Sequence, residues 1–287
     1  MEQAIYAWGL RDARAALPQL ETLEDSELEA RLRQSLLEGW LHGDDRTAAG
    51  EYIAAISHPR QRGRLTFLLA AETMRDGSEA VMRWAAEVPE TAPNNFKQGA
   101  FYHASALVAR EDPRRAAEWF EAHRTRPYSA GSLEVIARRW SEYHDPPALF
   151  DWLRSLPAEG ERSEAIAAGF RVWLGRHADE AEAWLSGALP DPGLDPAIAE
   201  LVRSRMQESP TAALTWAARI EDEKLRRDTT LRSARTWRRR DPKALEAWLA
   251  SNALPEELER AILDGNAPAA AERKRVASPA PPRAARR

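Results

Sequence analysis

The stretch HDPPALFDWLRSLP, residues 144–157, contains the signals of a short helix in chain order. Asp145 can accept a hydrogen bond from an N–H of the first turn that has no partner within the helix. Pro146 has no N–H to leave unpaired, and its φ angle is already helical. Trp152 follows within an apolar stripe, and Pro157 stops the helix. The stretch therefore predicts one short helix that packs through an indole.

The same arrangement returns along the chain at nearly constant intervals. Aromatic residues spaced 32 to 35 residues apart occupy the place of Trp152: Tyr52, Trp84, Trp119, Trp152, Trp184, Trp216 and Trp248. A second tryptophan follows 21 residues later in three of these units, as Trp140, Trp173 and Trp237. Self-similarity at a period of this size is typical of proteins built from repeated helix pairs.

Apolar residues within each unit have helical spacing. Leu149, Trp152, Leu153 and Leu156 lie at i, i+3, i+4 and i+7, which forms one stripe on an α-helix and does not fit strand alternation. Such short helices are not stable alone in water, so each pair must stack on its neighbours. We therefore predict an all-α fold, an α-solenoid (superhelix) of about seven to eight two-helix repeats with a period near 32 residues. The aromatic residues of both series are its predicted structural core.

The predicted repeat domain spans residues 1–265. It begins with an irregular helical pair at about 2–43, continues with regular repeats at about 45–254, and ends with a capping helix at about 255–265. Residues 266–287, rich in Ala, Pro and Arg, carry a charge of +5, whereas the remaining chain carries −9. This segment has too few apolar residues to build a core, so we predict a disordered basic tail.

Two stretches resemble the junction between tetratricopeptide repeats: DPKALEAW at 241–248 and HADEAEAW at 177–184. The chain is similar to tetratricopeptide and HEAT arrays but diverges from them, because its period is nearer 32 than 34. It also lacks the Gly expected four residues after the Trp, where it has Leu156, Ala188, Ile220 and Asn252. The resemblance implies a protein-interaction scaffold and does not indicate which peptide is bound.

Composition and motifs argue against several other classes. The chain has no Cys, which excludes disulfides, thiol catalysis and Cys-based metal sites. It has no nucleophile elbow, P-loop, dinucleotide fingerprint or zinc-protease motif. Three of its six His lie at turns between repeats. A metal site would need these turns to come together, whereas a solenoid would hold them apart. We expect no catalytic residue, no metal, no cofactor and no enzymatic activity.

The chain also lacks the sequence signals of a membrane or secreted protein. No stretch approaches the length of a membrane span. The first residues contain an early acid and no basic segment followed by an apolar run, so we see no signal peptide. We therefore expect a cytoplasmic protein that has no membrane partner.

The segment KLRRDTTLRSARTWRRRDPK, residues 224–243, is the most strongly charged part of the predicted repeats. It holds nine Lys and Arg against two Asp. A basic ridge here could contact phosphates, dock an acidic peptide or the acidic part of a neighbouring chain, or be an ordinary solvated face. The candidate partner-binding residues are Arg232, Arg235, Arg238, Arg239 and Arg240.

The sequence favours a non-enzymatic scaffold or adaptor that binds a segment of a partner protein on the concave face of the solenoid. The alternative is a helical repeat protein that binds nucleic acid through residues 224–243 and the basic tail. A third possibility is an enzyme or its accessory domain, which would need a deep pocket with convergent carboxylates or His.

Overall fold

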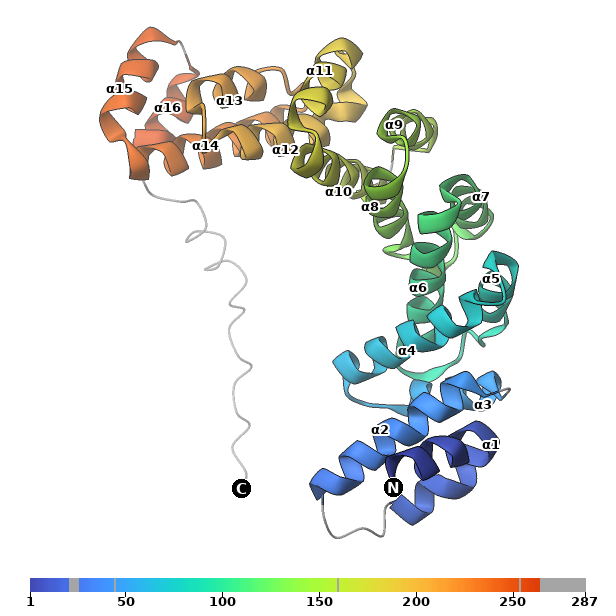
Figure 1. The fold of residues 1–287 in the computed structure, drawn as a ribbon. Helices are drawn as coiled ribbons and strands as arrows, with labels where there is room; N and C mark the ends of the chain where they lie inside the picture. Colours follow the sequence, from blue (N-terminus) through green and yellow to red (C-terminus); the bar gives the residue numbers. More distant parts are fainter. Residues whose placement is uncertain (21–25, 44, 159, 253, 264–287) are drawn as a thin grey trace, which may run out of the picture. The chain divides into compact units, whose positions relative to one another are not determined.

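The computed structural model describes residues 1–20, 26–43, 45–158, 160–252 and 254–263. Every regular element within these ranges is helical: sixteen α-helices, α1–α16, and three short 3-10 helices, η1–η3 (Figure 1). The predicted all-α class is therefore confirmed. The chain divides into two compact units, Met1–Arg176 and His177–Arg287, called unit 1 and unit 2. The predicted tail, residues 266–287, lies outside the described residues.

Unit 1 contains ten α-helices and two 3-10 helices. Their bounds are α1 (Glu2–Leu20), α2 (Ser26–His42), α3 (Arg46–Ala55), α4 (Pro59–Met74), α5 (Ser78–Glu87), η1 (Pro93–Asn95), α6 (Phe96–Glu111), α7 (Pro113–His123), η2 (Pro127–Ser129), α8 (Ser132–Tyr143), α9 (Pro146–Ser155) and α10 (Gly160–Arg176).

Unit 2 contains six α-helices and one 3-10 helix. Their bounds are α11 (Ala178–Ala188), η3 (Pro192–Leu194), α12 (Asp195–Arg205), α13 (Pro210–Ala217), α14 (Glu223–Arg240), α15 (Pro242–Ser251) and α16 (Glu256–Leu263). None of the described helices is both long and apolar enough to cross a membrane.

Helices with odd and even labels play different parts in the packing. In unit 1 the even-numbered helices from α2 to α10 follow one another: α2 contacts α4, α4 contacts α6, α6 contacts α8, and α8 contacts α10. Each odd-numbered helix from α3 to α9 packs against the even-numbered helices before and after it. Figure 1 shows α5, α7 and α9 along one side of unit 1 and α4, α6, α8 and α10 along the other. In unit 2, α13 likewise packs against α12 and α14, and α12, α14 and α16 follow one another. Below, α3, α5, α7, α9, α11, α13 and α15 are called first helices, and the even-numbered helices are called second helices.

Except for α5, which begins after Gly77, the first helices begin after an Asp, Ser or His of the repeated pattern, in four cases at the Pro of an Asp-Pro or Ser-Pro pair. Their first residues are 46, 78, 113, 146, 178, 210 and 242. Asp45, Asp112 and Asp241 each accept a hydrogen bond from the backbone N–H three residues later, as expected of N-cap residues. Asp145 and Ser209 make no such bond, so these two helices begin at a proline without a side-chain cap. His177, which precedes α11, also makes no cap bond.

In three places aromatic residues join a second helix to the first helix that follows it. Trp40 packs against Tyr52, Trp140 against Trp152, and Trp237 against Trp248, with ring centroids 5.5, 5.6 and 6.2 Å apart. Among the ten predicted core aromatics, the buried ones are Trp140, Trp173, Trp216 and Trp237. The half-buried ones are Tyr52, Trp84, Trp119, Trp152, Trp184 and Trp248. Most rings of the first helices therefore pack on one side and reach the surface on the other.

The pair α1–α2, predicted to be irregular, crosses with unusually close backbones. A Cβ added to Gly39 would lie 2.1 Å from the carbonyl oxygen of Tyr6, and one added to Gly9 would lie 2.2 Å from that of Leu36. Such distances leave room only for glycine. A kink at Asp12, whose φ and ψ are −161° and 76°, interrupts α1.

Candidate functional site

A pocket of about 450 Å³ lies between the first helices α3 and α5 in unit 1. It is called the Trp84 pocket here. Its apolar lining includes Ala54, Trp84, Val88 and Phe96. The ring of Trp84 meets that of Phe96 edge-on, at 6.4 Å between centroids. The pocket therefore has an aromatic wall formed by two helices that a short connection joins.

The connection between α5 and α6 is fixed in place by asparagine. Asn94 and Asn95 both have a left-handed backbone, with φ of 58° and 57°, a region that Asn tolerates better than most residues. The side-chain amide of Asn94 donates to the carbonyl of Ala54 at 2.9 Å. This bond holds Pro93 and Phe96 beside the C-terminal end of α3, where they line the pocket.

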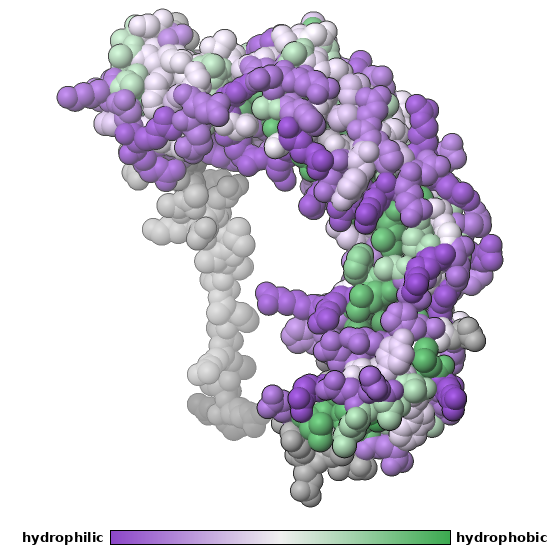
Figure 2. All heavy atoms as spheres, viewed as in Figure 1, coloured by the Kyte–Doolittle hydropathy of each residue, from purple (hydrophilic) through white to green (hydrophobic). Residues whose placement is uncertain are grey.

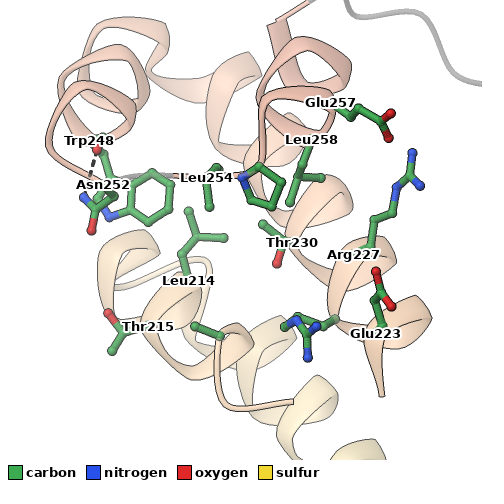
Figure 3. A pocket seen from close by; sticks show the side chains of 13 residues that line it. Leu214, Thr215, Glu223, Arg227, Thr230, Trp248, Asn252, Leu254, Glu257 and Leu258 are labelled. Atoms are coloured by element: carbon green, nitrogen blue, oxygen red, sulfur yellow. Dashed lines mark hydrogen bonds between the residues drawn. The ribbon is translucent and has the colours of Figure 1, made fainter. Parts of the chain in front are cut away.

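A second pocket of about 420 Å³ occupies the equivalent place in unit 2, between α13 and α15. It is called the Trp248 pocket. Seven of its lining residues lie 164 residues after seven that line the first pocket. The matched pairs are Gly50 with Leu214, Glu51 with Thr215, Ala54 with Ala218, Trp84 with Trp248, Val88 with Asn252, Thr91 with Pro255, and Pro93 with Glu257. Figure 3 shows the side chains of Leu214, Leu254 and Leu258 around the space beside the Trp248 ring, with Glu223, Arg227 and Glu257 at one end.

The two pocket indoles differ from two of their equivalents, Trp152 and Trp216, in how their N–H group is used. Trp152 donates to a carboxylate oxygen of Glu121 at 2.7 Å, and Trp216 donates to one of Glu182 at 2.9 Å. Both acceptors belong to the preceding first helix. Within the described part of the chain, the indole N–H groups of Trp84 and Trp248 have no hydrogen-bond acceptor.

The sequence accounts for part of this difference. Glu182 stands 34 residues before Trp216. Gly50 and Leu214 stand at the same distance before the two pocket tryptophans, and neither has a side-chain acceptor. In place of an indole–carboxylate contact there is a pocket. The absence of a carboxylate at Gly50 and Leu214 can be seen in the sequence. That it leaves a pocket beside the tryptophan follows only once the facing helices are known.

The Trp84 pocket carries negative charge over an apolar floor. Its ionisable lining residues are Glu51 and Glu87. Glu87 is the last residue of α5, where a carboxylate adds to the negative end of the helix dipole instead of opposing it. Glu51 accepts a hydrogen bond from Arg14 at 2.5 Å, and both of these side chains are more than half exposed. The pocket therefore favours a positively charged group.

The Trp248 pocket has mixed charge. Glu223, Glu257, Arg226 and Arg227 all line it. Arg226 is already engaged, because its guanidinium donates to the carbonyl of Ile220 at 2.7 Å. The two pockets thus share position and shape-forming residues but differ in electrostatics.

Three of the five arginines predicted to form a binding ridge are anchored to backbone carbonyls. Arg238 donates to the carbonyls of Ile262 and Leu263, both at 2.6 Å, and Arg235 donates to that of Ala261 at 3.3 Å. Arg240 donates to the carbonyl of Gln207, which follows α12, at 2.7 Å. The remaining two, Arg232 and Arg239, are exposed on α14. The structure therefore does not bring the five guanidinium groups together as one free surface.

Two titratable groups outside the pockets, Lys97 and His103, have pKa values lowered by burial. The amine of Lys97 donates to the carbonyls of Ala86 and Val88 at 2.6 and 2.5 Å, and burial lowers its pKa. Burial also lowers the pKa of His103, while a hydrogen bond with the backbone of Gly63 acts in the opposite direction. Within the described ranges, no group of three or more His, Asp and Glu could hold a metal ion.

The visible face of unit 1 has an apolar area around α6 (Figure 2). Phe67, on the neighbouring helix α4, is 43% exposed. Its ring meets the His103 ring of α6 edge-on, at 5.6 Å between centroids. This surface lies on the second helices, whereas the two pockets lie between first helices.

We compared the chain with protein families, with curated proteins and with solved structures. None matches it. The resemblance to tetratricopeptide and HEAT arrays therefore stays a prediction, and the function must be argued from the geometry of the chain itself.

Proposed function

We propose that the chain is a non-enzymatic protein-interaction scaffold. Its helix pairs would form an α-solenoid similar to tetratricopeptide and HEAT arrays, and the pockets between first helices would hold side chains of a partner segment. The observation that carries this proposal is the equivalence of the Trp84 and Trp248 pockets, which occupy one place in the repeated pattern. A pocket at the same place in each unit suits a protein partner that inserts side chains between first helices.

The chemistry of the pockets supports a protein partner. Aromatic residues at the centre of a binding surface contribute strongly to affinity, because they offer a large apolar area and a polar edge. The indoles of Trp84 and Trp248 are half-buried, line a pocket and keep their N–H group available to an acceptor. Each pocket is large enough for one or two side chains of a peptide.

The alternative function, nucleic-acid binding, receives less support. It depends on the basic segment 224–243, in which Arg235, Arg238 and Arg240 already donate to backbone carbonyls. A guanidinium held in this way has fewer donors left for phosphates. The acids that line the Trp84 pocket would also repel a polyanion.

The proposed function is tested by filling both pockets. Thr47 and Thr215 are exposed residues that line the Trp84 and Trp248 pockets, so Thr47→Phe and Thr215→Phe place a ring in each pocket with little effect on folding. Affinity capture from the native cell, with proteins identified by mass spectrometry, should retain a partner on the wild-type chain and lose it on the double variant. Ala122→Phe, at an exposed position on α7, is the matched control and should retain the partner.

Two results would contradict the proposal. Equal capture by the double variant and the control would show that partner binding does not use the pockets. A purified chain that captures no protein and turns over a substrate would be an enzyme and not a scaffold.

A further inference from the structure

We propose that the Trp84 pocket binds an arginine side chain from a basic segment of a partner protein. This inference rests on the proposed function and adds the chemistry of the group that is recognised. It follows from the charge of the pocket, from the geometry of its aromatic wall and from a contact within unit 2.

The charge of the pocket selects a cation. Glu51 and Glu87 are the two ionisable residues of its lining, and both are acids. Glu51 lies in the middle of α3, where it pairs with the exposed Arg14. Glu87 is the last residue of α5, so the partial negative charge of that helix C-terminus adds to its own. A carboxylate at this end of a helix costs stability, so a local rule is broken at the pocket in a way typical of binding sites.

The apolar part of the pocket selects a cation with a long hydrocarbon stem. Ala54, Val88 and Phe96 form the floor beside the half-buried Trp84 ring. Lysine and arginine both bury their stems along apolar surface while the charged head stays near water. A small hydrated cation would leave this floor uncovered.

A contact within unit 2 favours arginine over lysine. Trp216 occupies the same place in its helix as Trp84, and the guanidinium of Arg219 lies over its ring, 4.5 Å from the centroid. In the Trp84 pocket, a guanidinium from a partner can take the equivalent place on the indole. A planar guanidinium stacks on an aromatic face and can at the same time donate two parallel hydrogen bonds to a carboxylate such as Glu87.

The Trp248 pocket provides an internal comparison. It contains Arg226 and Arg227 as well as Glu223 and Glu257, so it lacks the net negative charge that would attract arginine. We therefore assign arginine binding to the Trp84 pocket alone.

The experiment measures peptide binding to the full chain by fluorescence anisotropy. The probe is a fluorescein-labelled peptide of alternating arginine and alanine, and its counterparts replace arginine with lysine or with citrulline, the uncharged isostere. We expect the arginine peptide to bind about tenfold more tightly than the lysine peptide, because only the guanidinium can stack and bind in two-pronged fashion. The citrulline peptide should not bind measurably.

Variants locate the binding to the pocket. Glu87→Gln should weaken arginine-peptide binding about tenfold, because it removes the charged acceptor. Glu118→Gln, at an exposed position on α7, removes the same charge elsewhere and should change affinity less than about twofold. Trp84→Leu should remove the preference for arginine over lysine. If this last variant fails to fold by circular dichroism, the Glu87→Gln comparison still decides.

Three outcomes would overturn the inference: equal effects of Glu87→Gln and Glu118→Gln, equal affinities for the arginine and citrulline peptides, or tighter binding to a chain lacking residues 266–287. The last result would mean that the basic tail of the chain itself occupies the pocket. In one further case the arginine peptide fails to bind, while the Thr47→Phe/Thr215→Phe variant still loses its captured partner. That result would support the scaffold function and contradict only the assignment of arginine to the pocket.

Discussion

Lys97 shows how the fold uses a buried cation. It is 7% exposed, and its amine lies 4.7 Å from the centre of the Tyr128 ring while donating to two carbonyls at the end of α5. The carbonyl dipoles and the electron-rich ring compensate for lost hydration.

In other helix pairs an arginine donates to a backbone carbonyl six residues earlier. The pairs are Arg62 with Ile56, Arg162 with Leu156, and Arg226 with Ile220.

His103 should make the stability of unit 1 depend on pH. Burial between the rings of Phe67 and Tyr102 lowers its pKa in the folded chain, whereas in the unfolded chain the pKa is about 6.5. Between these two values the unfolded chain binds a proton that the folded chain does not. The contribution of neutral, buried His103 to the free energy of unfolding is therefore fully present above the unfolded pKa. It is lost as the pH falls from the unfolded pKa towards the lower folded pKa.

The measurement for His103 is urea unfolding at neutral and mildly acidic pH. The wild-type chain should lose more stability between the two conditions than His103→Gln, because glutamine does not titrate. Each unit of pKa difference corresponds to about 1.4 kcal/mol. His177→Gln is the control, since His177 is exposed and makes no cap bond, and it should keep the pH dependence of the wild type. Identical pH dependence in His103→Gln and the wild type would refute the assignment.

At the scale of elements, helix starts could be predicted from sequence and inter-helix contacts could not. Asp45, Asp112 and Asp241 cap the helices that follow them, because capping depends on residues a few positions apart. Asp145 looks equivalent in sequence but makes no cap bond. Neighbour geometry beyond the local pattern decides that difference.

Polar contacts between residues far apart in the chain could not be predicted either, because they depend on which helices are neighbours. Asp195 is buried, and its carboxylate accepts hydrogen bonds from the backbone N–H groups of Glu221 at 3.0 Å and Asp222 at 2.7 Å. It holds the connection from α13 to α14 from a position 26 residues earlier. No sequence pattern indicates this role of Asp195. Nor does any pattern indicate that Arg238 binds the end of α16 or that Arg240 binds the residue after α12. The Trp84 and Trp248 pockets likewise follow from helices that face each other across a full repeat.

The crossing of α1 and α2 leads to a prediction about glycine. Gly39→Ala would place a methyl group against the backbone of α1. Because no side-chain rotation can relieve that clash, the helices must separate, at a cost of about 1–3 kcal/mol. Gly63→Ala in α4 is the opposite case, since a Cβ there meets nothing within 4 Å. It should stabilise the chain by up to about 1 kcal/mol, because alanine favours a helix over glycine.

Thermal unfolding and hydrogen exchange check the glycine prediction. Gly39→Ala should lower the melting temperature of the first transition and raise amide exchange in α1 and α2. Gly63→Ala should leave exchange in these helices unchanged and raise the melting temperature. A Gly39→Ala chain that melts like the wild type would mean that the two helices do not cross as closely as described.

At the scale of the whole molecule, the contacts within each unit predict that destabilising one helix affects its neighbouring helices and not the entire chain. Each helix in unit 1 packs mainly on the next helix and on the one after it. In arrays of this kind, stability is close to a sum of repeat and nearest-neighbour terms, and damage does not spread evenly. A single-core globular protein would instead lose protection throughout when one large core residue is removed.

Trp140→Ala distinguishes these two cases. Trp140 is 4% exposed on α8 and stacks on Trp152 of α9, so its truncation should cost about 3–5 kcal/mol. Hydrogen exchange followed by mass spectrometry should show lost protection in α8, α9 and α10, while α14, α15 and α16 of unit 2 keep theirs. Arg138→Ala, at an exposed position on the same helix, should leave protection in both units intact. If Trp140→Ala exposed the helices of unit 2 as strongly as α8 itself, the units would share one cooperative core, and an array of nearest-neighbour contacts would be the wrong description.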